Sequence, residues 1–80
     1  MMKRRTYTRM EEKLLRRGFN KQPECDFYLT REHQNKYDDH EKGAVYTLMK
    51  KNAVEKIGPA HFRLTHAGRR SVEKGEIDNG

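Results

Sequence analysis

Residues 39–65 read DHEKGAVYTLMKKNAVEKIGPAHFRLT, in which a helical pattern is followed by a strand pattern. From His40 to Lys51 the apolar side chains recur at helical spacing, which predicts a helix with one buried stripe. Asp38 or Asp39 is expected to cap its start. Asn52 is expected to end it, because Asn tolerates left-handed backbone angles better than most residues. The predicted stripe consists of Ala44, Val45, Leu48 and Met49.

A hairpin is predicted directly after this helix. The strands 53–57 and 60–64 flank a Gly-Pro turn pair, and the second strand alternates polar and apolar residues. A loop of residues 58–60 would place Val54 opposite Leu64. The same register places unlike charges side by side, at Glu55 and Arg63, and therefore favours pairing.

The residues before this stretch predict two more helices and an ambiguous segment. Apolar residues between Thr6 and Arg17 form one stripe, and Gly18 occupies the position of a left-handed residue after a helix. Residues 25–29 fit either a short strand or an extended approach to the next element. Thr30 is expected to cap a short polar helix over Arg31–Tyr37.

A last short helix is predicted over His66–Lys74, with Thr65 as its cap. Residues 75–80 have almost no apolar side chains and are expected to form a flexible tail. The chain is therefore expected to contain one domain, residues 1–74. Its predicted core is small and comprises Tyr7, Met10, Leu14, Leu15, Phe19, Val45, Leu48, Met49, Val54, Phe62 and Leu64.

Two segments carry a resemblance to a known family. Residues 62–70 read FRLTHAGRR, and their pattern aromatic-x-Leu-Thr-x-x-Gly-Arg is similar to the second wing strand and following helix of many small bacterial regulators. Residues 48–54 resemble the end of a recognition helix and the start of the first wing strand. The chain thus resembles a winged helix-turn-helix domain, although that family often has Gly where Asn52 stands here. The implied fold is α+β, with three helices, a two-stranded wing hairpin and a short C-terminal helix.

The resemblance implies that the protein binds double-stranded DNA and regulates transcription. The helix at 40–51 would enter the major groove, and the wing and the N-terminal segment would approach the backbone. The residues implied in DNA binding are Lys42, Tyr46, Thr47 and Lys50 on the helix, His61 and Arg63 on the wing, and Arg4, Arg5 and Arg9 near the N-terminus.

The charge distribution is compatible with a polyanionic partner. The chain has a formal net charge of +6, and residues 1–22 supply all of this excess with eight Lys or Arg and two acids. Such an excess suggests nucleic acid, although a solvated helix face has the same composition. A phage or mobile-element origin would suit a protein of this size.

Other features favour a protein partner instead. Asp38, Asp39 and Glu41 crowd the start of the proposed recognition helix, where they would repel phosphate, although acids there also stabilise the helix dipole. The alternative is therefore an adaptor or inhibitor that uses the same fold to bind a protein. Four apolar residues without a place in the predicted core offer a surface for such a partner or for a homodimer: Phe27, Tyr28, Ile57 and Val72.

Several function classes are disfavoured by the sequence. The histidines and Cys25 lack the close spacing of a metal site, and no coherent set of acid, base and nucleophile is present, so neither a cofactor nor an enzymatic activity is expected. No segment has the length and hydropathy of a membrane helix, and no apolar stretch follows the basic N-terminus as in a secretory signal. A lone cysteine suits the reducing cytoplasm.

Overall fold

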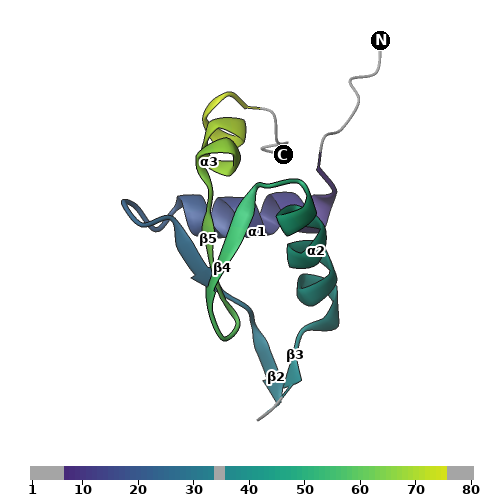
Figure 1. Cartoon of the computed structure of the whole chain (residues 1–80). Helices are drawn as coiled ribbons and strands as arrows, with labels where there is room; N and C mark the ends of the chain where they lie inside the picture. Colours follow the sequence, from purple (N-terminus) through teal and green to yellow (C-terminus); the bar gives the residue numbers. More distant parts are fainter. Residues whose placement is uncertain (1–6, 34–35, 76–80) are drawn as a thin grey trace.

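Three helices and five strands make up the part of the chain that the structure describes, residues 7–33 and 36–75 of a computed structural model. Figure 1 shows them in the order α1 (Arg9–Phe19), β1 (Asp26–Tyr28), β2 (Arg31–His33), β3 (Lys36–Tyr37), α2 (Asp39–Lys50), β4 (Val54–Gly58), β5 (His61–Leu64) and α3 (His66–Glu73). This is a small α+β fold, as the sequence predicts. The predicted tail lies outside the described residues apart from Gly75.

The main sheet has three antiparallel strands in the order β1-β5-β4. The predicted hairpin register is confirmed, since Val54 pairs with Leu64 and Glu55 with Arg63. The ambiguous segment at 25–29 contributes the third strand, in which Phe27 lies opposite Phe62. The central strand β5 thus pairs with both neighbours, and its side chains alternate between the two faces of the sheet.

The predicted helix over Arg31–Tyr37 is wrong, because this segment is an antiparallel pair of short strands, β2 and β3. Thr30 caps no helix there, and its hydroxyl donates to the Glu41 carboxylate at 3.0 Å. Polar residues 31–37 also lack an apolar stripe with which a helix could pack. The described chain therefore has three helices where four were expected, and the turn before α2 does not join two helices.

Helix α1 starts and ends later than predicted. Thr8 caps it in a reciprocal capping box with Glu11, so Tyr7 precedes the helix. The prediction of a left-handed Gly18 is wrong, because Gly18 lies within the helix. A Cβ atom at Gly18 would lie 2.9 Å from the ring of Phe27 and would also collide with Leu64. Glycine is needed there for close helix–sheet packing.

The ends of α2 and α3 agree with the local signals in the sequence. The Asp38 carboxylate accepts hydrogen bonds from the backbone N–H groups of His40 and Glu41 and so caps α2. Asn52 has a φ of 62°, the predicted left-handed conformation. Thr65 caps α3 by accepting from the N–H of Gly68. Helix α2 is consequently fixed in direction at both ends.

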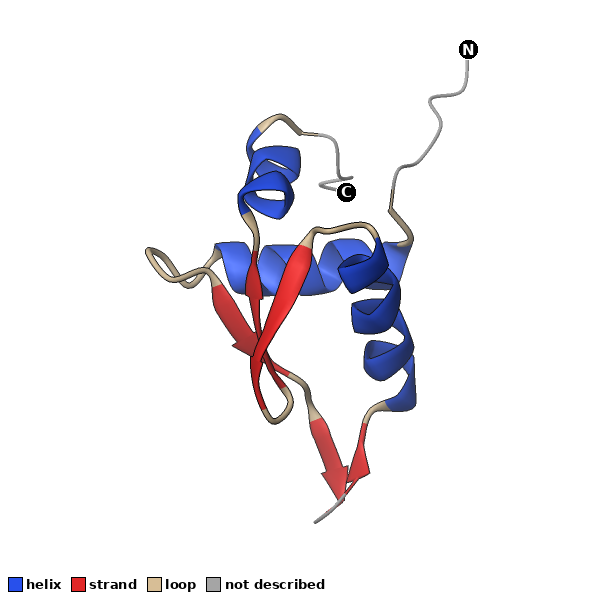
Figure 2. Ribbon diagram, viewed as in Figure 1, coloured by secondary structure: helices blue, strands red, loops and turns tan. Residues whose placement is uncertain are grey.

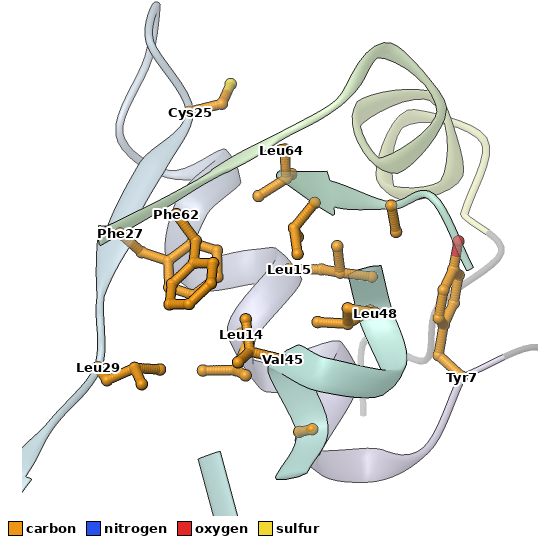
Figure 3. Packing of buried hydrophobic residues seen from close by; sticks show 13 residues of the cluster. Tyr7, Leu14, Leu15, Cys25, Phe27, Leu29, Val45, Leu48, Phe62 and Leu64 are labelled. Atoms are coloured by element: carbon orange, nitrogen blue, oxygen red, sulfur yellow. The ribbon is translucent and has the colours of Figure 1, made fainter. Parts of the chain in front are cut away.

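The core lies between α1, α2 and the inner face of the sheet (Figure 3). Most of the predicted core residues are buried, and Met10, Phe19 and Met49 pack at its margin. Phe27 was expected to remain available for a partner, but it is only 1% exposed and stacks against Phe62. Tyr28 and Ile57, in contrast, are exposed at 58% and 41%.

Candidate nucleic-acid interface

The face of α2 that points away from the core carries the exposed side chains Lys42, Tyr46 and Lys50. Tyr46 is 57% exposed, and the Lys50 ammonium lies 4.7 Å from the centroid of its ring. The Lys42 Nζ atom lies 3.6 Å from a carboxylate oxygen of Asp39, one turn earlier on the helix surface. All three predicted contact residues are therefore available to a partner.

Thr47 differs from the other predicted residues of α2. Its hydroxyl lies within hydrogen-bond distance of the Glu11 carboxylate in α1 and 2.8 Å from the carbonyl oxygen of Ala44. A hydroxyl has a single hydrogen to donate, and both of these acceptors are intramolecular. Thr47 thus connects α2 to α1, and its predicted role in base recognition remains a prediction.

Glu11 is buried at the junction of α1 and α2. Its side chain accepts hydrogen bonds from the Thr8 N–H at 2.8 Å and from the Lys51 ammonium at 2.7 Å. Burial raises the pKa of Glu11, but the hydrogen bonds from Lys51, Thr47 and Thr8 outweigh it and leave the pKa below its ordinary value. The Thr8-x-x-Glu11 spacing is a capping-box signal in the sequence, whereas the link to Lys51 is not visible there.

Glu41 is the second buried carboxylate and connects three elements. Arg17 of α1 donates from Nη1 at 3.2 Å and from Nη2 at 2.9 Å, while Thr30 donates from its backbone N at 2.8 Å and from its hydroxyl at 3.0 Å. Burial raises the pKa of Glu41, but the bonds from Arg17 and Thr30 lower it further than burial raises it. We call this set of three residues the Glu41 clamp.

The Glu41 clamp corrects the expectation that Glu41 would repel DNA from the start of α2. The side chain is directed into the protein and is neutralised by Arg17, and the residue is only 3% exposed. The Asp38 carboxylate is engaged in capping, and Asp39 lies beside Lys42. Of the three acids in this cluster, Asp39 is the one classed as exposed.

The two predicted wing residues, His61 and Arg63, lie on the outer face of the sheet, opposite the core. His61 Nε2 is 2.7 Å from Asp26 Oδ2, and the His61 ring stacks on Tyr28 with centroids 4.0 Å apart. The hydrogen bond with His61 lowers the pKa of Asp26. Arg63 donates to Glu55 from Nε at 3.1 Å and from Nη2 at 2.8 Å. Both wing residues thus already have an acidic partner within the protein.

The predicted N-terminal contacts are described only in part. Arg4 and Arg5 lie outside the described residues, and Arg9 is exposed at the first position of α1. The residues on either side of Arg9 line a shallow groove of about 390 Å³ together with the first half of α2. The groove is lined by Thr8, Met10, Asp39, His40, Gly43, Ala44 and Thr47. The start of α1 therefore lies beside the exposed face of α2.

Metal and redox chemistry find no support among residues 7–33 and 36–75. No group of three or more His, Cys, Asp or Glu in these ranges is placed to hold a metal ion. Cys25 is a free cysteine and is fully buried. No helix in the described ranges is long and apolar enough to cross a membrane.

Comparisons with protein families, with curated protein sequences and with solved structures found no significant match to this chain.

Proposed function

We propose that this protein is a small, non-enzymatic DNA-binding protein of the winged-helix type, in which α2 lies in the major groove and β4–β5 forms the wing. The observation that carries the proposal is the exposed face of α2, with Lys42, Tyr46 and Lys50 outward and the Glu41 carboxylate turned inward. A role as a transcriptional regulator fits this kind of binding.

The spacing of the exposed side chains on α2 suits the major groove. Lys42 and Lys50 are two helical turns apart, which corresponds to about 12 Å along the axis, and Tyr46 lies between them. The major groove of B-DNA is about 12 Å wide and accommodates an α-helix, whose diameter with side chains is about 10–12 Å, so a helix lying in the groove presents such residues to successive positions of the duplex. Each lysine can bind a phosphate or donate to guanine O6 and N7, and the Tyr46 hydroxyl can donate to a phosphate.

The N-terminal segment adds a second source of positive charge beside α2. Arg9 is exposed where α1 adjoins the first half of α2, and the chain before it includes Arg4 and Arg5. Such arginines bind phosphates whatever the base sequence, and so they raise affinity more than specificity.

A salt titration of DNA binding tests the proposal. Fluorescence anisotropy with a random duplex of about 20 base pairs should give binding at ~50 mM salt, with a log–log slope near −5 if about six phosphates are neutralised. The double variant Lys42→Ala/Lys50→Ala should bind at least about tenfold more weakly, because it loses two cations at the groove.

A charge-matched control separates position from total charge. The variant Lys13→Ala/Lys74→Ala also removes two exposed lysines, one from α1 and one after α3, and should bind nearly as the wild type does. Absence of binding by the wild-type protein at low salt would overturn the proposal. An equal loss in both double variants would show that α2 has no special role.

A protein partner is a second candidate function, and one observation favours it for the outer face of the sheet. There Tyr28 and Ile57 are exposed, Tyr28 stacks on His61, and the acids Asp26 and Glu55 are bonded to His61 and Arg63. Aromatic and aliphatic side chains with internally paired charges are typical of protein interfaces.

The two functions make different predictions for the same variant. Tyr28→Ser/Ile57→Ser should abolish capture of a nuclease-resistant partner from lysate while DNA binding stays unchanged. Loss of every captured protein after nuclease treatment of the wild-type sample would contradict the second candidate.

A further inference from the structure

The β2–β3 hairpin projects from the body of the protein, and most of its described residues are polar and exposed. All three residues of β2 are exposed, and in Figure 2 the hairpin extends beyond the start of α2 and the β4–β5 turn. Arg31 lies opposite Tyr37, and His33 lies opposite Lys36. Tyr37, at the end of β3, packs against the core, whereas the residues of β2 lie outside it.

The side chains of this hairpin are ordered by contacts across its strands. The Arg31 guanidinium lies 5.3 Å from the centroid of the Tyr37 ring, and its Nη2 donates to the Tyr37 hydroxyl at 3.0 Å. A guanidinium stacked on an aromatic ring keeps several N–H donors free for a phosphate. Arg31 and Lys36 are two exposed cations on the described hairpin, against one acid, Glu32.

The root of the hairpin is fixed to the rest of the fold. Thr30, the residue before β2, belongs to the Glu41 clamp, since its N–H and its hydroxyl both donate to the Glu41 carboxylate. The Thr30 carbonyl accepts from the Asp38 N–H at 3.0 Å. Leu29 donates to the carbonyl of Ala60 in the β4–β5 turn at 3.0 Å. The hairpin is thus held in a fixed relation to α2 and to the wing.

The hairpin is also placed beside the proposed recognition helix. Strand β3 ends at Tyr37, and α2 begins at Asp39. Figure 1 shows the hairpin at the same end of the molecule as the start of α2 and the β4–β5 turn. If a duplex is bound there with α2 in its major groove, the cations of the hairpin lie near the phosphates at the edge of that groove.

From this placement we infer that β2–β3 is a second DNA-binding element, in which Arg31 and Lys36 bind phosphates that flank the groove occupied by α2. The inference rests on the proposed function. The contacts are to phosphates rather than to bases, because α2 fills the groove and Arg31 is held against Tyr37. The hairpin therefore adds affinity that does not depend on sequence.

The test is the same anisotropy titration with the variant Arg31→Ala/Lys36→Ala. Loss of two phosphate contacts should lower the steepness of the log–log salt slope by about 1.8 and weaken binding at least about fivefold at low salt. The loss should be equal on two unrelated duplex sequences, since phosphates carry no sequence information. Circular dichroism establishes that the variant is folded.

The charge-matched controls make the outcomes distinct. The inference is supported if Arg31→Ala/Lys36→Ala lowers both the affinity and the steepness of the salt slope while Lys13→Ala/Lys74→Ala changes neither. A further supporting result is that the single variant Arg31→Lys, which keeps the positive charge, binds more tightly than the single variant Arg31→Ala. It is overturned, with the proposed function intact, if the hairpin variant binds like the Lys13/Lys74 control while Lys42→Ala/Lys50→Ala binds weakly. Both ideas fail together if the wild-type protein does not bind.

Discussion

Asn52 is the residue at which α2 gives way to the sheet, and its left-handed backbone makes its identity important. With φ at 62°, most residues that have a Cβ atom are strained there. Gly is tolerated because it has none, and Asn because its short polar side chain can hydrogen-bond locally. Its carbonyl also accepts the Thr65 hydroxyl at 2.6 Å, which connects the end of α2 to the start of α3.

Asn52→Ala should therefore lower the free energy of unfolding by about 1 kcal/mol, while Asn52→Gly should not lower it. Urea unfolding measures both. Asn20→Ala is the matched control, because Asn20 is exposed and has right-handed backbone angles. If the two alanine variants unfold at the same urea concentration, backbone strain is not the cause.

Residues whose role is local were the ones that the sequence could identify. Asp38, Asn52 and Thr65 act on backbone groups within a few positions of themselves, so their chemistry is visible in a short window. Glu11 and Glu41 have partners far along the chain, since Lys51 is 40 residues from Glu11 and Arg17 is 24 residues from Glu41. No single-sequence pattern reveals such pairs, and the sequence alone therefore predicts that Glu41 faces the partner of α2.

At the scale of elements, the Glu41 clamp is the contact that joins α1, the root of β2 and α2. Removal of a buried carboxylate that accepts from charged and neutral donors strongly destabilises a protein, because the donors are left without an acceptor. The pKa of Glu41 lies below its ordinary value in the folded protein. Its contribution to stability is thus complete above the ordinary carboxyl pKa of about 4.3 and is lost as the pH falls through the lower, folded-state value.

Glu41→Gln should lower the free energy of unfolding at pH 7 by about 2–3 kcal/mol, and the difference from the wild type should shrink in acid below about pH 4. Urea unfolding at a series of pH values measures this convergence. The control Glu73→Gln removes an exposed carboxylate from α3 and should change stability by no more than about 0.5 kcal/mol. If the difference in unfolding free energy between Glu41→Gln and the wild type stays constant down to pH 2, the charge on Glu41 does not contribute to stability.

The same clamp explains why the element at 31–37 was predicted wrongly. Thr30 before a polar segment is a normal helix-start signal, and nothing in residues 31–37 opposes a helix strongly. Glu41 holds the backbone N–H and the hydroxyl of Thr30 at the root of β2, and this contact spans 11 positions, beyond the reach of a local helix-start signal. The proposal for the hairpin cations Arg31 and Lys36 could not be made from the sequence for the same reason, since their placement depends on that hairpin.

At the scale of the whole molecule, stability depends on a small core around β5. Phe62 is buried, lies on the central strand and stacks on Phe27 with ring centroids 5.9 Å apart. The predicted register of β4 and β5 already placed Phe62 inward, because alternation along a strand assigns its faces. The third strand was not assigned from the sequence, since a segment of three residues carries too little periodicity.

Phe62→Ala should cost about 3–5 kcal/mol, a large fraction of the stability of a domain of this size. Thermal unfolding followed by circular dichroism should show loss of the cooperative transition or a midpoint lowered by well over 10 °C. Tyr46→Ala removes an equally large aromatic side chain from an exposed position and should leave the midpoint nearly unchanged. A folded Phe62→Ala protein with a wild-type midpoint would contradict the assignment of the core.

The hydroxyl of Tyr7 lies 3.0 Å from that of Ser71, so segments separated by 64 positions meet just before α1 and within α3. A peptide bridge from the chain after Glu73 to the chain before Tyr7 would accordingly close the polypeptide into a ring, and the backbone could be opened anew in the exposed loop after α1. We expect such a rearranged polypeptide to keep the strand pairings and helices described above, because both the bridge and the new opening lie outside them.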